Sequence, residues 1–500
     1  MFLKRTIFTT LTSTFRTHHL FHFPSRIFSQ ISHLHMSVKS HSSHATSSVN
    51  YGFPEEDLRQ EGNDNPGYFP ARLGQTLEGG RFCIVRKLGW GQYASVWLAK
   101  DKKEDRFAAL KILTCESTRA LQESGPKQRS DELRMLQKIA SAQPNHRGFK
   151  HNLILYDSFE FRGPHGVHLC LVTEVLGYGV DYIRKGNENG DLRLSMALTK
   201  RLTKQLLCSL DYLHDVCGIV HTDIKHDNIL FRPSDVFAVV AHELTAKPSI
   251  SYDCGTEVSP PVVPVVSQAL PLSTEESVAT DQLQAVLADV GHSHWKDRHF
   301  QELVQPSALR APEVILGYSW STSADIWNLG CLVTEWLIGF WLFEFSPNGD
   351  KWDAEEDHLA RMTEALGAKF DPNFISKCEH RTKFFNADGS FKNFTGHEEP
   401  TWPLEKLLDR FASVDLGKEN VDAAARFFAS VLAVKSRGTT QCSRAASRPV
   451  ACRLVIISEV STHDWDSSLM YQVMAMLNVK SLLAATTVQK DPFTNKPVIL

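Results

Sequence analysis

The sequence predicts an α+β fold of two lobes, in which a small, mainly β lobe with one helix precedes a larger, mainly α lobe. From Phe69 to Ile112 strand patterns alternate with turns, whereas leucines recur with helical spacing from Leu198 to Leu213. The most apolar run, Leu329 to Phe345, contains Glu335 and is therefore typical of a buried helix rather than a membrane span. We expect the small lobe over residues 66–176 and the large lobe over residues 177–436.

The composition is that of a globular intracellular protein. Its 500 residues, 42% hydrophobic and 22% charged, are enough to build substantial cores. The formal net charge of -3 argues against direct nucleic-acid binding. Ten cysteines without C-x-x-C pairs are typical of reduced thiols. We expect a monomer with no membrane partner.

The N-terminal stretch differs from the rest. Residues 1–54 contain no Asp or Glu but several Arg and Lys and many Ser, Thr and His. Such a composition is typical of a mitochondrial transit peptide, and equally of a disordered leader. A third alternative is that the protein begins at Met36. We therefore expect residues 1–65 to be a disordered leader or a transit peptide, which makes mitochondria an alternative location.

A glycine-rich turn runs from Leu88 to Val96. Gly89 and Gly91 would let backbone N–H groups approach phosphates without interference from a Cβ atom, and Leu88 and Val96 would flank the nucleotide. Ala94 stands at the third glycine position of the full pattern and adds slight bulk. A Gly-x-Gly turn alone is more often only a hairpin, so this signal needs the others.

The next strand, Phe107 to Leu113, carries Lys111 among apolar neighbours. Because burying an unpaired ammonium is costly, a Lys at this place implies anionic partners. We predict that Glu132, on the following helical run, is one partner and that nucleotide phosphates are the other. Asp131 is the alternative partner. A further alternative is that Glu132 is only a solvent-exposed carboxylate on the surface of the helix.

A further strand runs into Gly177 and suits a hinge at which adenine binds. We predict that backbone groups of Glu174 and Leu176 contact adenine. Thr173 stands just before them and is expected to leave a roomy pocket behind the hinge.

The pattern H-x-D-x-x-x-x-N follows the leucine-rich helix, at residues 221–228. Phosphoryl transfer needs a carboxylate that accepts the proton of the acceptor hydroxyl, a cation near the moving phosphate and an oxygen ligand for Mg²⁺. We predict that Asp223, Lys225 and Asn228 take these roles in that order.

The triplet Asp289-Val290-Gly291 supplies the second predicted metal ligand, Asp289. Val290 replaces the aromatic residue of this pattern, so lighter packing is expected beneath the metal site. The stretch before it, about 232–284, is an insertion rich in Pro, Ser and Val, and its part from Ser249 to Thr280 is predicted to be exposed.

The triplet Ala311-Pro312-Glu313 closes the segment expected to bind the acceptor. Asp325 begins the apolar central helix and is predicted to hydrogen-bond the backbone of residues 221–228, the catalytic loop. Residues 437–500 are expected to form an atypical tail.

These motifs, in this order, resemble those of the protein kinase superfamily. The sequence around these motifs is similar to that of the SR-protein kinases, a branch of the CMGC Ser/Thr kinases, and particularly to the fungal members. The similarity extends over roughly residues 66–435. The resemblance implies an ATP- and Mg²⁺-dependent kinase that phosphorylates Ser in Arg/Ser-rich splicing factors and resides in cytoplasm and nucleus. The resemblance also implies a basic partner for Glu313, for which Arg437 and Arg448 are the candidates. The segments that carry it are Arg86–Gly91, Glu174–Gly177, His221–Lys225 and Trp320–Trp327.

Two departures from the wider kinase pattern bear on regulation and substrate. Thr222 stands where most kinases carry an Arg that grips a phosphate on the activation segment, so we predict activity without such phosphorylation. Ser307 stands where the wider group carries an Arg, which leaves a strict Arg/Ser preference open.

An acidic cluster lies ahead of a further amphipathic helix. Clustered carboxylates repel one another unless cations neutralise them, as an Arg-rich peptide would. The family resemblance implies a docking groove here, whereas a solvated helix start is the alternative. The predicted docking residues are Asp353, Glu355, Glu356, Asp357 and Glu364.

An active Ser/Thr kinase acting on Arg/Ser-rich proteins is therefore the leading hypothesis. A catalytically impaired pseudokinase scaffold is the alternative, supported by Ala94 and Val290. A small-molecule kinase is disfavoured by the Ala311–Glu313 triplet and by the acidic cluster.

Overall fold

The computed structural model describes residues 55–59, 65–125, 128–186, 190–252, 262–275, 278–345, 351–367, 369–396, 402–417, 421, 489–490 and 497–498. These residues belong to one compact unit. Most of the predicted leader and tail lie outside them, as do Arg437, Arg448 and the insertion residues 253–261.

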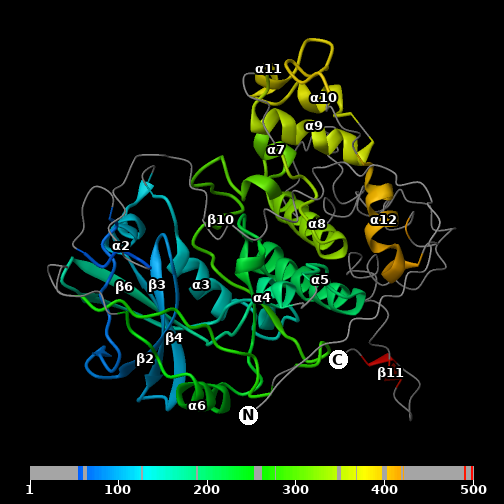
Figure 1. Ribbon diagram of the computed structural model, residues 1–500. Coiled ribbons are helices and arrows are strands. Elements are labelled where there is room, and N and C mark those ends of the chain that lie inside the picture. Colours follow the sequence, from blue (N-terminus) through cyan, green and yellow to red (C-terminus); the bar gives the residue numbers. More distant parts are fainter. Residues whose placement is uncertain are drawn as a thin grey trace, which may run out of the picture. The chain divides into compact units, whose positions relative to one another are not determined.

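The small lobe is a six-stranded antiparallel sheet in the order β1-β2-β3-β4-β6-β5 (Figure 1). The glycine-rich turn joins β2 to β3, and Lys111 lies on β4 opposite Val96 of β3, as the strand patterns predict. Its strands are β1 Thr76–Leu77, β2 Phe82–Gly91, β3 Ala94–Asp101, β4 Arg106–Leu113, β5 Leu155–Arg162 and β6 Val167–Thr173.

Helices α2, Cys115–Gln122, and α3, Glu132–Ser141, complete the small lobe. Thr114 caps α2 by accepting a hydrogen bond from the backbone N–H of Ser117, which satisfies one of the donors that a helix start leaves unpaired. Helix α3 buries Met135, Leu136 and Ile139 on one face, and this places Glu132 on its first turn towards the sheet.

The large lobe is mainly helical, as predicted. Helix α5, Met196–Asp211, buries Leu202, Leu206 and Leu210 against α8, Thr322–Ile338, which is buried along nearly its whole length. The apolar run that starts at Leu329 is therefore the core of this lobe as far as Ile338. The helix predicted to extend to Phe345 ends there, and Trp341 is 53% exposed. The remaining helices are α4 Val180–Lys185, α7 Pro312–Ile315, α9 Ala354–Leu366, α10 Pro372–Ile375, α11 Arg381–Phe384 and α12 Leu404–Leu416, with the short helical turns η2 Phe149–His151, η3 Tyr212–Cys217, η4 His226–Asn228 and η5 Ser307–Leu309.

Two short antiparallel pairs flank the catalytic loop. Strand β7, Ile219–Val220, pairs with β10, His294–Trp295, and β8, Ile229–Phe231, pairs with β9, Ala285–Leu287. The second pair brings the end of the catalytic loop beside the residues that precede Asp289. A separate pair, β11 Gln489–Lys490 with β12 Pro497–Val498, lies near the C-terminus of the sequence.

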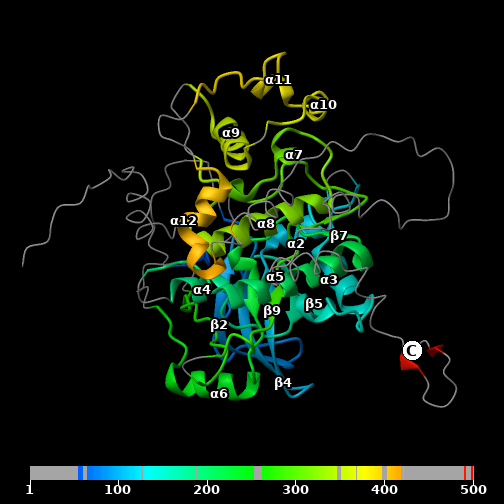
Figure 2. The same cartoon turned by 90° about the vertical axis from the view of Figure 1, so that its right-hand side faces the viewer.

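The insertion packs against the small lobe, and the prediction that it is exposed is wrong at several residues. Its helix α6, Val236–Ala246, buries Val239 and Val240 against Leu98 and Val175, and in both views α6 lies at one end of the sheet (Figures 1 and 2). Further along, Val265, Leu270 and Leu272 are also buried. The Pro and Ser residues of this stretch led to the prediction that it is exposed to solvent, but its apolar residues make buried contacts.

Residues 55–59, placed in the predicted leader, also pack on the small lobe. Lys87 of β2 is almost completely buried, and its ammonium is bonded to the carboxylates of Glu55 and Glu56. Glu55 in turn accepts hydrogen bonds from the backbone N–H and the hydroxyl of Ser267 in the insertion. A pair of acids just before the small lobe thus neutralises a cation that a strand interior could not otherwise hold.

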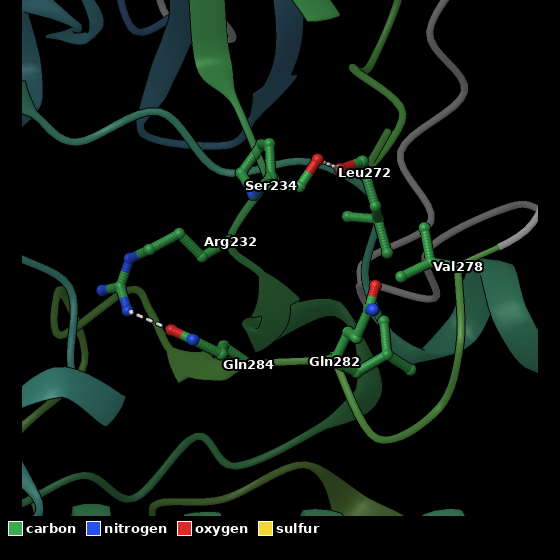
Figure 3. Close-up of a pocket in the computed structure, with 8 residues that line it drawn as sticks. Arg232, Ser234, Leu272, Val278, Gln282 and Gln284 are labelled. Atoms are coloured by element: carbon green, nitrogen blue, oxygen red, sulfur yellow. Dashed lines mark hydrogen bonds between the residues drawn. The ribbon is translucent and has the colours of Figure 1, made fainter. Parts of the chain in front are cut away.

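A cavity of about 190 Å³ opens where the insertion leaves β8, between Arg232, Ser234, Leu272 and Gln284 (Figure 3). Arg232 donates to Gln284 across it and binds the Glu174 carboxylate at 2.7 Å. None of the predicted metal or glycine-rich-turn residues lines this cavity. Across the described part of the chain, no helix combines the length and apolarity that a membrane crossing requires.

Candidate active site

Asp325 hydrogen-bonds the backbone of the catalytic loop, as predicted. Its carboxylate accepts hydrogen bonds from the backbone N–H groups of His221 at 2.8 Å and Thr222 at 2.7 Å, and from His214 at 2.7 Å. Burial opposes ionisation of Asp325, but these donors outweigh it and lower its pKa. A buried carboxylate on the rigid first turn of α8 therefore sets the position of the loop.

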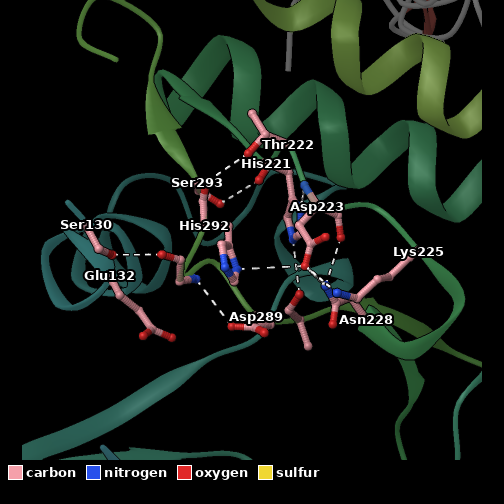
Figure 4. Close-up of polar contacts among 12 residues, drawn as sticks. Ser130, Glu132, His221, Thr222, Asp223, Lys225, Asn228, Asp289, His292 and Ser293 are labelled. Carbon is pink, nitrogen blue, oxygen red and sulfur yellow. Dashed lines mark hydrogen bonds and ion pairs between the residues drawn. The ribbon is translucent and has the colours of Figure 1, made fainter. Parts of the chain in front are cut away.

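The predicted catalytic residues meet at Asp223 (Figure 4). Lys225 Nζ lies 2.8 Å from Asp223 Oδ2, and Asn228 Nδ2 donates to the same oxygen at 2.9 Å and to the Asp223 carbonyl at 2.8 Å. These bonds orient the carboxylate on a short loop, as a proton acceptor for a bound hydroxyl requires.

Lys111 connects the two lobes by bonding two carboxylates. Its Nζ lies 2.6 Å from Glu132 Oε1 and 2.9 Å from Asp289 Oδ1. Burial opposes the charge of Asp289, but Lys111 outweighs it and holds the pKa of Asp289 well below its usual range. Burial raises the pKa of Glu132, and Lys111 counteracts that effect.

Of the two candidate acids, Glu132 rather than Asp131 takes the place beside Lys111. Asp131 instead accepts a hydrogen bond from Trp295 Nε1 at 2.8 Å and an ion pair from Arg134. The ambiguity between these neighbours is therefore resolved by the direction each side chain takes at the start of α3.

The arrangement fits a divalent metal ion. Ligand atoms of Asp223, Asp289 and His292 all lie within 4.8 Å of one another. The Ala288 N–H donates to the Asn228 carbonyl at 2.9 Å, which places Asn228 beside the strand that delivers Asp289. Since Asn228 Nδ2 faces Asp223, its Oδ1, which no described residue hydrogen-bonds, remains as an oxygen ligand of the kind that hard cations prefer.

Sequence reasoning missed His292, which follows the Asp289 triplet. Its Nδ1 lies 3.9 Å from Asp223 Oδ2, and its ring lies edge-on to Tyr93 at the glycine-rich turn. The sequence carried no spacing signal for this residue, because the contact arises from the pairing of β7 with β10.

The predicted nucleotide residues of the glycine-rich turn are accessible to a ligand to different degrees. Leu88, Gly89 and Val96 are partly exposed, whereas Gly91 is exposed at the tip of the turn. The Leu176 N–H makes no hydrogen bond to a described residue and remains open to a ligand, whereas the Glu174 N–H donates to Ile154 at 3.1 Å.

Two of the predicted docking acids do not face solvent, so this prediction is corrected for them. Glu356 is buried and accepts from the backbone N–H groups of Asn393 and Phe394. Asp357 is buried and pairs with Arg361 at 2.9 Å, one turn along α9. Helical spacing did not reveal that this face of the helix packs inward.

The other docking acids reach the surface. Lys383 Nζ lies 3.1 Å from Asp353 and 2.6 Å from Glu355, and all three side chains are at least one-third exposed. Glu364 is partly exposed. Asp353 also caps α9 by accepting from the Glu356 N–H, as the helix-start alternative predicted.

The triplet Glu313 accepts a hydrogen bond from Ser323 Oγ at 3.1 Å. Burial raises its pKa. Both arginines proposed as its partners lie outside the described residues.

The chain is similar in sequence to known proteins. A protein kinase domain model matches residues 82–254. A serine/threonine-protein kinase SRPK of Physarum polycephalum is 34% identical and covers 76% of this chain and 88% of its own length. Protein kinase dsk1 of Schizosaccharomyces pombe is 29% identical, covering 69% and 76%, and SRSF protein kinase 3 of Mus musculus is 25% identical, covering 68% and 83%. The chain therefore belongs to the SR-protein kinases, a family of serine/threonine protein kinases that use ATP and a divalent metal ion.

Proposed function

We propose that this kinase transfers the γ-phosphoryl group of Mg-ATP to Ser in Arg/Ser-rich, splicing-factor-like proteins. The observation that carries the chemistry is the Asp223 carboxylate, oriented by Lys225 and Asn228 and within 4.8 Å of a ligand atom of Asp289. The name of the relative SRSF protein kinase 3 supports the acceptor class.

Each side chain has a role that follows from its position. Asp223 accepts the proton of the serine hydroxyl as the oxygen attacks, and Lys225, bonded to the same carboxylate, neutralises the phosphoryl group that moves past it. Lys111, held by Glu132, positions the phosphates from the small lobe. Bound Mg²⁺ would supply the charge that offsets the phosphate oxygens, with Asn228 and Asp289 as its ligands.

Activity is proposed to be independent of activation-segment phosphorylation. Thr222 adopts a left-handed backbone conformation with φ of 62°, and its hydroxyl donates to the His292 carbonyl at 2.8 Å. This short neutral side chain bonds the segment directly, where an Arg would need a phosphate as its partner.

The surface acids are proposed to attract basic substrates. Asp353 and Glu355 both pair with the half-exposed Lys383, and Glu355 also lies 3.8 Å from Arg310, while Glu364 lies further along α9. An Arg-rich peptide offers several bidentate donors and can displace the exposed lysine from these carboxylates, because exposed ion pairs contribute little.

The test is phosphate transfer from radiolabelled ATP to an Arg/Ser-repeat peptide, with Lys/Ser and Ala/Ser peptides in parallel. Transfer should favour Arg/Ser, and Asp223→Asn should lower kcat by at least about a hundredfold. Asp388→Asn changes a fully exposed Asp in the same way and should leave the rate unaltered. Equal transfer by the Asp223 variant, or no preference for Arg, would overturn the proposal.

Independence of phosphorylation has its own test. Phosphatase-treated enzyme, shown by mass spectrometry to carry no phosphate on residues 289–313, should retain full activity. Loss of activity that returns on rephosphorylation would contradict this part of the proposal.

We further propose residence in cytoplasm and nucleus, on the strength of the family. Imaging of the full chain tagged at its C-terminus tests this, and an exclusively mitochondrial signal would favour the acid-free N-terminal stretch as a transit peptide.

A further inference from the structure

Tyr68, which precedes the first strand of the sheet, makes a contact that none of the motifs predicts. Its ring is 5% exposed, and its hydroxyl lies 2.8 Å from the Gly91 carbonyl oxygen and 3.2 Å from that of Gln92. Both acceptors lie at the tip of the glycine-rich turn between β2 and β3. One hydroxyl proton is thus shared by two backbone oxygens of the turn.

The segment that carries Tyr68 is anchored elsewhere. The backbone carbonyls of Pro66 and Gly67 accept from the N–H groups of Glu116 and Cys115 at the start of α2, at 3.1 and 3.0 Å. Asn65 Oδ1 accepts from the Gly67 N–H at 3.0 Å. Tyr68 therefore ties the turn to the first turn of a capped helix, and the tie does not depend on the turn itself.

Apart from the β2–β3 pairing, which reaches Gly91 and Ala94, few side chains restrain the tip of the turn. Gly89 and Gly91 lack side chains, and a Cβ added to either would meet no neighbouring atom. Residues of this kind lose the most freedom when they are ordered. The Trp90 ring, 46% exposed, contacts the Tyr68 ring edge-on at 6.3 Å between centroids.

The opposite side of the turn touches the catalytic groups. The ring of Tyr93 meets His292, which lies beside Asp223, and the Tyr93 carbonyl accepts from the Thr114 N–H at 3.0 Å. Thr114 is also the cap of α2. Both sides of the turn are therefore tied to the start of the same helix, and the tip has a defined position before any nucleotide is present.

We propose that Tyr68 is a positioning residue that holds the glycine-rich turn in its nucleotide-binding position. The hydroxyl lowers the entropy that the turn loses when its backbone N–H groups close on the phosphates. The N-terminal segment from Asn65 is accordingly part of the working enzyme, although it contributes no group to the chemistry.

The test compares Tyr68→Phe with wild type in the full chain. The variant keeps the ring and its contact with Trp90 and removes the hydroxyl only. We expect the KM for ATP, and the Kd for Mg-ATP measured by calorimetry without peptide, to rise about three- to tenfold, the range of one hydrogen bond. The KM for the acceptor peptide should not change.

Tyr156→Phe is the matched control. This tyrosine is 40% exposed and lies on Arg106, outside the turn, so loss of its hydroxyl should leave the KM for ATP unchanged. Unaltered ATP affinity in Tyr68→Phe would overturn the proposal, as would an equal rise of both KM values, which indicates a general loss of structure.

Hydrogen exchange of residues 88–96 decides the point without reference to activity. In the nucleotide-free variant these amides should exchange faster than in wild type, and added Mg-ATP should remove the difference. Identical exchange in the two proteins would refute the proposal, whatever the acceptor substrate proves to be.

Discussion

At the scale of single residues, the site is organised by carboxylates that each bond several donors. Asp325 accepts two backbone N–H groups of the catalytic loop, and Asp223 accepts Lys225 and Asn228. Because a buried donor without an acceptor costs about 1–3 kcal/mol, each of these acids affects stability as well as geometry.

Replacing Asp325 by Ala should therefore reduce both stability and turnover. Two backbone donors, those of His221 and Thr222, would lose their acceptor, at a cost of about 2–6 kcal/mol. The kcat should fall at least about tenfold because Asp223 loses its position, whereas the KM for ATP should hardly change since the hinge is untouched. Denaturant unfolding with steady-state kinetics checks this, and an unchanged kcat in the folded variant would contradict it.

The raised pKa of the buried Glu335 should make the stability of the protein depend on pH. Glu335 is buried beneath the catalytic loop against Arg184 at 2.7 Å, and burial raises its pKa to about 7 from the ordinary 4.5. In the folded chain Glu335 keeps its proton up to about pH 7, whereas in the unfolded chain it loses the proton near 4.5, so stability falls as the pH rises through this window.

The size of this effect is about 1.4 kcal/mol per unit of pKa difference, as an upper bound. Unfolding of wild type and Glu335→Gln at several pH values between 5 and 8 measures it. The amide cannot ionise, so the difference in unfolding free energy between the two proteins should change in favour of the variant as the pH rises. A constant difference across this range would show that Arg184 keeps Glu335 ionised.

At the scale of elements, the insertion is tied to the small lobe by a buried ion pair. Arg86 of β2 is fully buried and pairs with Glu243 of α6 at 3.3 Å, and it also donates to the Glu243 and Lys247 carbonyls. Together with the buried Val239 and Val240, this pair makes α6 part of the nucleotide-binding lobe.

Glu243→Ala should thus destabilise the protein strongly. The change leaves the Arg86 guanidinium buried with only carbonyl partners, for which a loss of about 3–5 kcal/mol is expected. The control is Glu302→Ala, whose side chain is 79% exposed and whose removal should cost less than about 0.5 kcal/mol. Equal midpoints of thermal unfolding for these two variants would show that α6 contributes no stability.

The elements that sequence predicted well are those with a strong periodic or motif signal. The strands around the glycine-rich turn and the leucine-rich α5 lie where the patterns placed them, and so does the buried α8 as far as Ile338, where it ends seven residues before the predicted apolar run does. Glu356 and Asp357 were misjudged because a run of acids reads as exposed, although the structure supplies each with an internal donor.

Contacts between segments far apart in the chain could not be predicted, because no local sequence pattern marks them. Lys87 lies in a plain strand pattern, and its partners Glu55 and Glu56 precede the predicted lobe boundary. His292 meets Asp223 through tertiary pairing alone. By contrast Lys111 was assigned an acidic partner correctly, because a charged residue inside an apolar strand requires one.

At the scale of the whole molecule, the two lobes share one charged cluster in which Lys111 of the small lobe bonds Asp289 of the large lobe. A nucleotide with a divalent metal adds charges of both signs to this cluster and contacts both lobes. Ligand binding should therefore stabilise the folded chain as one unit.

Mg-ATP at about a hundred times its Kd should raise the free energy of unfolding by about 2.7 kcal/mol. The rise in unfolding temperature should disappear with EDTA, and it should be much smaller in Asp289→Asn, which weakens the metal site without a change of shape. A full shift in the presence of EDTA would argue against metal-linked binding at Asp289.

The ladder between β8 and β9 also determines where this chain can lengthen. Phe231 and Ala285 are direct partners in that ladder, so the intervening residues leave and return at adjacent positions. The separation of Asn228 and Asp289 is set by hydrogen bonds and is indifferent to how much polypeptide lies between them. Since extending a closed loop adds only a small logarithmic entropy term, this junction tolerates growth, and regulatory sequence can be acquired there while the chemistry at the other end of the ladder stays as it was.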